Sequence, residues 1–147
     1  MSQKGKRKEF SVEWPEFNVK VTATLLEDKA PKLCKQFWES LPYESHSGHV
    51  FVAGESGGIG GPKPFIITHM ENPTTRDPGT FYVYRGLGVS MPYGHITEPT
   101  VVNKFAQINA EDLKKYDQAI KKIGKYAWRV TMTGVGKRPK TIVRRKE

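Results

Sequence analysis

A stretch of nine residues near the N-terminus alternates apolar and polar side chains, and this alternation constrains the fold more than any other feature. Phe17, Val19, Val21, Ala23 and Leu25 occupy every second position of residues 17–25. A period of two places these side chains on one face of an extended strand and the polar ones on the other. The chain is therefore expected to build a β-sheet with one buried face.

Two helices are predicted by capping residues and by apolar residues at helical spacing. Asp28 as an N-cap, followed by a proline in the first turn, predicts a helix over about residues 28–41. Asn109 as a cap, acidic residues behind it and Gly124 as a stop predict a second helix over about residues 110–123. The helix over residues 110–123 has the clearest pattern of the two.

Short apolar runs predict further strands, and segments rich in glycine and proline predict loops between them. The predicted strands are residues 49–53, 65–68, 80–84 and 126–132. Turn signals between residues 65–68 and 80–84 favour a hairpin-like pairing of these two strands. Residues 54–62 are expected to form a mobile or tightly turned glycine-rich loop, and residues 91–95 a binding loop. The order of elements indicates an α+β or mainly β fold, with a barrel closed or partly closed by two helices.

The positive charge of the chain is concentrated at its two ends. The formal net charge is +9, yet residues 9–136 carry no net charge. Residues 1–8 are expected to form a disordered basic tail, and residues 137–147 a disordered or loosely held basic tail. The globular part is then not a basic protein, and we expect a nucleic-acid partner to be unlikely.

The length of 147 residues predicts one domain, which we place at residues 9–136. The single cysteine, Cys34, excludes an internal disulfide and is expected to be a small core residue. No apolar run reaches the roughly 20 residues that a membrane helix requires, and the N-terminus lacks a secretory signal. We therefore expect a cytoplasmic protein without a membrane partner.

Several familiar motifs are absent. The glycines of residues 54–62 match neither the dinucleotide-binding pattern nor the phosphate-binding loop of nucleotide hydrolases. The four histidines do not form a compact zinc-ligand pattern. No serine hydrolase elbow exists, although residues 54–57 superficially resemble one. We expect neither a metal nor a cofactor.

Eight polar or titratable residues lie where the predicted strands meet loops. If they converge, they can form a proton-transfer site, because histidine titrates near neutral pH and a half-buried carboxylate can have its pKa raised toward it. The candidate catalytic residues are Glu55, His95, Tyr93 and His49, and the candidate substrate-binding residues are Arg85, Asn103, Lys104 and Tyr84. The alternative for each residue is packing at a sheet edge or simple solvation.

The order of several short segments resembles a family of small bacterial proteins with a cyclophilin-like fold, related to cucumopine synthase. The matching segments are residues 21–34, 37–43, 79–84, 91–94 and 103–108. The resemblance covers roughly residues 15–135 and implies a cyclophilin-like barrel. It further implies a Pictet–Spengler-type condensation, because cucumopine synthase joins histidine to 2-oxoglutarate and closes a ring.

If this chemistry carries over, the resemblance implies roles for the candidate residues. Arg85 or Lys104 would hold a substrate carboxylate, while Glu55 and His95 would transfer protons. Tyr93 would orient the intermediate together with Asn103. The arginine after Phe-His and the Gln-x-Gly segment of the peptidyl-prolyl isomerases are both missing, so we expect no isomerase activity.

Three functions follow as alternatives. The first is a cofactor-free lyase or synthase that acts on a small carboxylated substrate, joining an amine or amino acid to an oxo acid. The second is a noncatalytic module that binds a small ligand or a peptide. The third is a protein that binds a polyanion through its basic tails. A homo-oligomer is possible through an exposed sheet edge.

Overall fold

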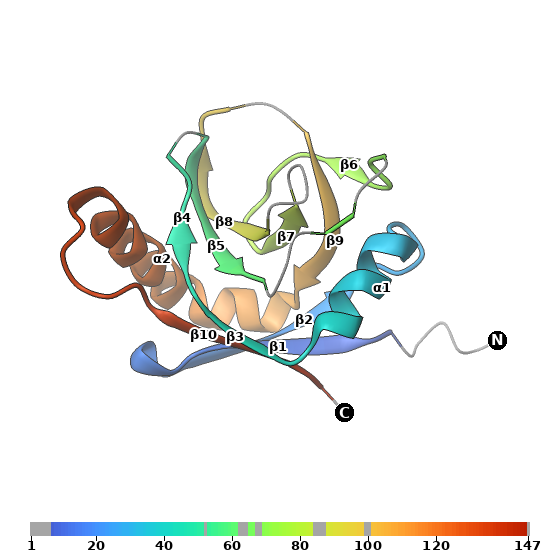
Figure 1. Ribbon diagram of the computed structural model, residues 1–147, viewed down its shortest axis with the longest axis horizontal. Coiled ribbons are helices and arrows are strands. Elements are labelled where there is room, and N and C mark those ends of the chain that lie inside the picture. Colours follow the sequence, from blue (N-terminus) through green and yellow to red (C-terminus); the bar gives the residue numbers. More distant parts are fainter. Residues whose placement is uncertain are drawn as a thin grey trace.

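The computed structural model describes residues 7–51, 53–61, 65–66, 69–83, 88–98 and 101–146. In these residues two α-helices pack against one antiparallel sheet (Figure 1). The helices are α1 (Pro31–Ser40) and α2 (Ala110–Thr133), and a 3-10 turn, η2, covers Pro15–Phe17. The strands are β1 (Glu9–Trp14), β2 (Val19–Leu25), β3 (Tyr43–His46), β4 (Gly48–His49), β5 (Gly54–Gly60), β6 (Pro73–Thr74), β7 (Thr80–Val83), β8 (Val89–Ile96), β9 (Val102–Ile108) and β10 (Lys140–Arg145).

The sheet closes on itself almost completely. Its strand order is β3-β10-β1-β2-β9-β7-β8-β5-β4, with β6 paired to β9. The two outer strands, β3 and β4, follow each other in the chain with only Ser47 between them. Because the same stretch of chain pairs with β10 on one side and with β5 on the other, the two edges of the sheet meet. The predicted class, an α+β barrel with two helices, is confirmed.

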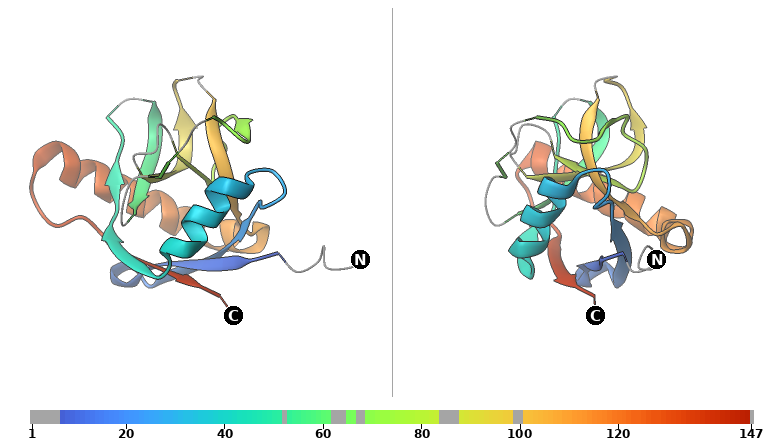
Figure 2. Two further views of the ribbon diagram at one scale, coloured as in Figure 1. Left: turned by 45° about the vertical axis from the view of Figure 1, so that its right-hand side comes forward. Right: turned by 90° about the vertical axis from the view of Figure 1, so that its right-hand side faces the viewer.

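The interior of the barrel is filled by aromatic rings and by the apolar faces of both helices. The ring of Phe10 lies 4.7 Å from that of Phe37 and 5.5 Å from that of Phe81, and Phe37 lies 4.8 Å from Phe105, measured between centroids. Ile120 of α2 belongs to the same buried cluster. Figures 1 and 2 show α1 and the C-terminal half of α2 on opposite sides of the barrel.

Helix α2 is much longer than predicted. The predicted strand at residues 126–132 is wrong, because these residues continue α2 to Thr133. Gly124 lies inside the helix, and Gly134 at φ 71° ends it by donating its N–H to Val130. Buried residues at 120, 123, 127 and 130 continue the helical spacing across Gly124. No helix in the described residues is both long and apolar enough to cross a membrane.

Helix α1 begins three residues later than predicted. It starts at Pro31, and its N-cap position is Ala30 rather than Asp28. Two backbone N–H groups of its first turn donate to a side chain outside the helix. The Glu71 carboxylate accepts hydrogen bonds from the N–H groups of Lys32 (3.0 Å) and Leu33 (2.9 Å). A carboxylate distant in the sequence therefore replaces the expected cap.

Residues 54–60 of the predicted glycine-rich loop and residues 91–95, predicted as a binding loop, are in strands. The glycine-rich segment forms β5, and residues 91–95 lie within β8, to which β5 pairs. The pairing of β5 with β8 is irregular, because its register shifts between Gly54 and Ser56 and again between Gly58 and Gly60. Glycine accommodates the backbone conformations that such shifts require. The backbone also approaches closely here, since a Cβ on Gly57 would lie 3.1 Å from the carbonyl oxygen of Gly48.

The prediction of a disordered or loosely held tail is wrong for Lys140–Arg145. These residues form β10, which pairs with β1 on one side and β3 on the other. Thr141 and Val143 are fully buried, because alternate side chains of β10 face the core. Lys140 and Arg144 thus lie on the opposite face of the strand, whereas Arg145 at its end contacts Trp38.

The remaining strand predictions are met in part. The predicted strand at residues 17–25 is observed as β2, and that at residues 80–84 as β7 up to Val83. Among the described residues of segment 49–53, only His49 is in a strand, and Val52 lies outside them. Phe65 and Ile66 are not in a strand, and residues 67–68 also lie outside the described residues. Strand β7 pairs with β8 and β9, so the predicted hairpin is wrong for its described part.

Candidate active site

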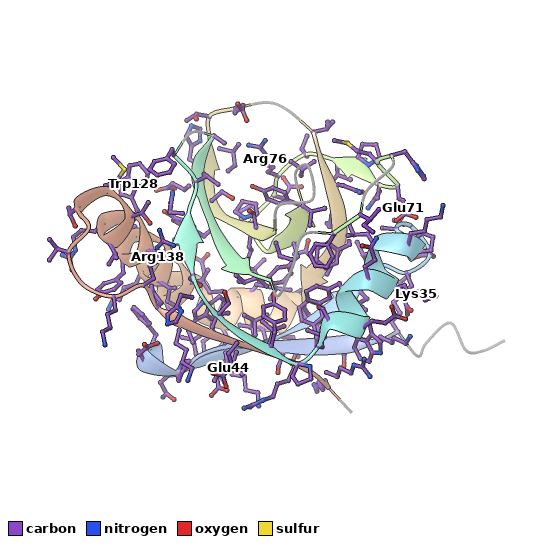
Figure 3. The ribbon with its side chains drawn as sticks, viewed as in Figure 1. Lys35, Glu44, Glu71, Arg76, Trp128 and Arg138 are labelled. Carbon is purple, nitrogen blue, oxygen red and sulfur yellow. The ribbon has the colours of Figure 1, made fainter. Side chains whose placement is uncertain are left out.

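An open groove of about 610 Å³ lies between the β4–β5 edge of the barrel and helix α2. It brings together three of the predicted catalytic residues, His49, Glu55 and Tyr93. The full lining is His49, Phe51, Ala53, Gly54, Glu55, Tyr93, Thr97, Lys125 and Trp128. Figure 3 shows Trp128 on the C-terminal half of α2, beside β4 and β5. The groove therefore combines proton-carrying groups with a cation and exposed aromatic rings.

His49 and Tyr93 form a hydrogen-bonded chain with a defined direction. The Nδ1 of His49 lies 2.7 Å from the carbonyl oxygen of Val50, and its Nε2 lies 2.7 Å from the hydroxyl of Tyr93. A carbonyl only accepts, so Nδ1 carries the proton. In the neutral ring Nε2 is then an acceptor, and the Tyr93 hydroxyl donates to it.

The electrostatics of the pair favour this neutral form. Burial lowers the pKa of His49 below its ordinary 6.5, although the Val50 carbonyl and the charge of Glu55 act in the opposite direction. Burial and the charge of Glu55 raise the pKa of Tyr93 to about 12. At neutral pH Tyr93 keeps its proton and His49 has a free lone pair to receive it.

Two glycines make room for the side chains of the site. A Cβ on Gly124 of α2 would overlap the ring of Tyr93, so the missing side chain lets this ring pack under the helix. A Cβ on Gly94 would overlap the carboxylate of Glu55. That carboxylate accepts a hydrogen bond of 2.8 Å from the backbone N–H of His95, which holds it across β5 and β8.

Helix α2 contributes residues that the sequence prediction missed. The ring of Trp128 lies 4.8 Å from that of His49, which in turn lies 5.5 Å from the ring of Tyr93. Lys125 lines the same groove. Ending the predicted helix before Gly124 hid both residues, although the helical spacing of the buried positions beyond Gly124 is visible in the sequence.

Three of the predicted residues that the structure describes, His95, Asn103 and Lys104, do not line the groove. The side chain of His95 is exposed and is not among those that line it. Asn103 and Lys104 lie on β9, where Asn103 accepts from the N–H of Asn72 and borders a small hollow with Glu71. Figure 3 shows Glu71 beside α1, on the side of the barrel opposite Trp128. Burial lowers the pKa of Lys104, and the charge of Asp77 partly offsets this.

Tyr84 and Arg85 lie outside the described residues. Cys34 is buried as predicted, with its Sγ 3.3 Å from the carbonyl oxygen of Phe105. Burial is the main cause that raises the pKa of this thiol to about 12. Within the described part of the chain, no group of three histidine, cysteine or acidic residues could hold a metal ion.

Comparison with known proteins shows a shared fold. No protein-family model matches the chain, and neither does any curated protein. Among solved structures it is similar to McbB, determined in complex with tryptophan, with a TM-score of 0.77 and 23% identity over 93% of this chain. The chain spans 44% of the length of McbB. It is also similar to the hypothetical protein AF2241 from Archaeoglobus fulgidus, with a TM-score of 0.63 and 15% identity over 99% of this chain and 100% of that one.

Proposed function

We propose that the chain is a cofactor-free enzyme that condenses an amine or amino acid with an oxo acid and closes a ring by a Pictet–Spengler-type reaction. The observation that carries the proposal is the chain of hydrogen bonds from the Val50 carbonyl through His49 to Tyr93, which ends in a groove that also holds Glu55. Such a chain can accept a proton from a substrate at the Tyr93 oxygen while the tyrosine proton moves to His49, so that no free tyrosinate has to form.

The fold comparison supports the same class of chemistry. McbB is a Pictet–Spengler-type enzyme, and its structure contains tryptophan, an amino acid with an aromatic ring. The resemblance of the sequence to relatives of cucumopine synthase points in the same direction. Because this chain spans less than half of McbB, the activity and substrates of that protein are only a guide to those proposed here.

The first half of the proposed reaction forms an iminium ion. The substrate amine gives up its extra proton to Glu55 and attacks the carbonyl carbon of the oxo acid. A second proton moves from the nitrogen to the former carbonyl oxygen, which becomes a hydroxyl group. Glu55 returns its proton to this hydroxyl group, which leaves as water while the carbon–nitrogen double bond forms. Lys125 at the edge of the groove would hold the carboxylate of the oxo acid in place of the predicted Arg85 or Lys104.

The second half closes the ring. A carbon of the aromatic ring attacks the iminium carbon, and the electrons of the double bond pass to nitrogen. The ring then loses a proton to regain its aromaticity. This proton would pass to the oxygen of Tyr93 as the tyrosine proton passes to Nε2 of His49. Trp128 and Phe51 offer exposed apolar rings against which a flat substrate can lie.

The test is a product search by mass spectrometry with mixtures of aromatic amines or amino acids and oxo acids. The expected product has the summed mass of both substrates minus one water, and its formation is lost in Glu55→Gln and Tyr93→Phe. A noncatalytic binding module is the outcome if the ligands bind but no such product forms with the wild type. The discriminating variant is Glu55→Ala, which for an enzyme should abolish turnover while leaving ligand affinity intact.

A further inference from the structure

The second half of α2 and the segment after it contain no acidic residue. From Gln118 to Lys140, with Lys140 included, every charged side chain is a cation, and there are seven of them. The sequence pattern assigned the basicity of the chain to flexible tails. The fold places four of these cations on the exposed side of α2, next to the groove.

Four of these cations surround one hollow of about 580 Å³ on the exposed side of α2. Its lining residues are Gln118, Lys121, Lys122, Lys125, Tyr126 and Arg129. The guanidinium of Arg129 lies over the Tyr126 ring, 5.4 Å from its centroid, and Lys121 is paired with Asp117 at 3.1 Å. Within the described residues neither Lys122 nor Lys125 forms an ion pair. The hollow therefore offers more positive charge than its own surroundings neutralise.

This basic hollow is continuous with the reaction groove, because Lys125 lines both. A ligand can lie in the groove against Trp128 and extend past Lys125 toward Arg129. A single carboxylate would neutralise one cation and leave the others unused. A phosphate group carries up to two charges and several acceptor oxygens, which suit both the point charges of lysine and the planar fork of arginine.

We propose that the basic hollow is an anion subsite for a phosphate-bearing end of the ligand whose reactive end lies in the groove. The substrate class is then an amine or oxo acid attached to a phosphate or diphosphate group, rather than a free amino acid. The inference rests on the proposed function only for the role of the groove. Binding of the phosphate end requires no turnover and can be measured by itself.

The experiment titrates the full chain with inorganic pyrophosphate by calorimetry, at low and at physiological salt. The test variant is Lys122→Gln/Arg129→Gln, which removes two exposed cations from the hollow. The matched control is Lys114→Gln/Lys115→Gln, which removes two exposed cations from the same helix outside the hollow. We expect the Kd of pyrophosphate to rise about tenfold in the test variant and to stay unchanged in the control.

A second readout ties the subsite to the groove. Lys125→Gln should weaken the binding of both pyrophosphate and a simple oxo acid, whereas Lys122→Gln/Arg129→Gln should weaken only pyrophosphate. Amide chemical shifts of the wild type should move at Lys121, Lys122, Lys125 and Arg129 when pyrophosphate is added. Shifts confined to other parts of the chain would overturn the proposal, even if a variant failed to fold.

The remaining outcomes are equally decisive. Absence of pyrophosphate binding, or equal losses in the test and control variants, would overturn the subsite. Binding of a mixed-sequence oligonucleotide without binding of pyrophosphate would replace it with a general polyanion surface. If pyrophosphate binds as expected but no amine and oxo acid react, the subsite stands and the proposed reaction fails.

Discussion

At the scale of single residues, the direction of one hydrogen bond determines what the site can do. The Val50 carbonyl fixes the proton of His49 on Nδ1, which leaves Nε2 to accept from Tyr93. Protonation of His49 would remove that acceptor, and the burial that lowers its pKa opposes this protonation. At neutral pH the pair is thus neutral, with the Tyr93 hydroxyl donating to Nε2 of His49.

The His49–Tyr93 bond should be visible in a titration. The pKa of His49, followed by NMR of its ring, is expected below 6.5 in the wild type. In Tyr93→Phe it should rise toward 6.5, because the hydroxyl that stabilises the neutral ring is lost. Turnover should fall as the pH drops through the pKa of His49. An unchanged His49 pKa in Tyr93→Phe would contradict the proposed direction of the bond.

The lowered pKa of His49 also has a consequence for folding. The unfolded chain binds a proton on His49 near pH 6.5, whereas the folded chain binds it only at lower pH. The contribution of His49 is therefore unchanged above pH 6.5, and it reduces the stability as the pH falls from 6.5 through the folded pKa. His49→Gln should show a weaker loss of stability over this range in urea titrations at several pH values.

Gly124 should be intolerant of the smallest possible side chain. In an exposed helix, glycine to alanine stabilises by about 1 kcal/mol. Here the new Cβ would overlap the Tyr93 ring, and overpacking costs roughly 1–3 kcal/mol. We expect Gly124→Ala to lower the free energy of unfolding and to reduce turnover by displacing Tyr93. The exposed change Lys114→Ala on the same helix, outside the groove and the basic hollow, is the control and should be nearly neutral. If Gly124→Ala were more stable than the wild type, the Tyr93 ring would have to be able to move aside for the new Cβ.

At the scale of elements, local patterns predicted those parts of the fold that local interactions decide. Strand β2 follows from its period of two, and α2 begins where Asn109 and the acidic residues after it indicate. Gly124 misled the prediction because a glycine inside a helix looks like a stop signal. The ring that needs this glycine belongs to Tyr93 of β8, and nothing near Gly124 in the sequence reveals this contact.

The candidate site was likewise predicted only in part from the sequence. His49, Glu55 and Tyr93 were identified as titratable residues at strand ends, and the structure brings them together. Asn103 was also predicted as a polar residue at a strand end. It borders a small hollow beside α1, however, and does not line the groove beside α2. Lys125 and Trp128 were missed because the length of α2 was misjudged. Which strand ends meet depends on the sheet order, which residue types do not determine.

The start of α1 gives a test of capping by a distant residue. Glu71 accepts the N–H groups of Lys32 and Leu33, whereas the sequence favoured Asp28 as the cap. Loss of a helix cap typically costs about 1 kcal/mol. Glu71→Ala should therefore lower the free energy of unfolding by roughly that amount, measured by urea titration. Asp28→Ala is the matched control and should have little effect, because Asp28 forms only an exposed pair with Arg7 at 3.8 Å. A larger loss in Asp28→Ala would contradict this account.

At the scale of the whole molecule, the barrel depends on one corner and on the last strand of the chain. Ser47 is buried where β3 passes into β4, and it bonds Nε1 of Trp14 (2.9 Å) and the hydroxyl of Thr141 (2.7 Å). Thr141 belongs to β10, so this contact joins the closure of the sheet to its C-terminal strand. All three groups are buried, so loss of either hydrogen bond would leave a polar group unpaired away from water.

Removal of β10 should therefore abolish the fold. Ending the chain at Pro139 would expose the edges of β1 and β3, leave Trp14 and Ser47 without Thr141, and uncover the core beneath Val143. Far-UV and near-UV circular dichroism should show loss of the native state. The matched control is Lys140→Gln/Arg144→Gln, which removes two charges but keeps the strand. Because both cations form only exposed ion pairs, worth at most about 1 kcal/mol each, this variant should fold. A truncated chain that folds like the wild type would restore the tail interpretation and would mean that the sheet can close without its tenth strand.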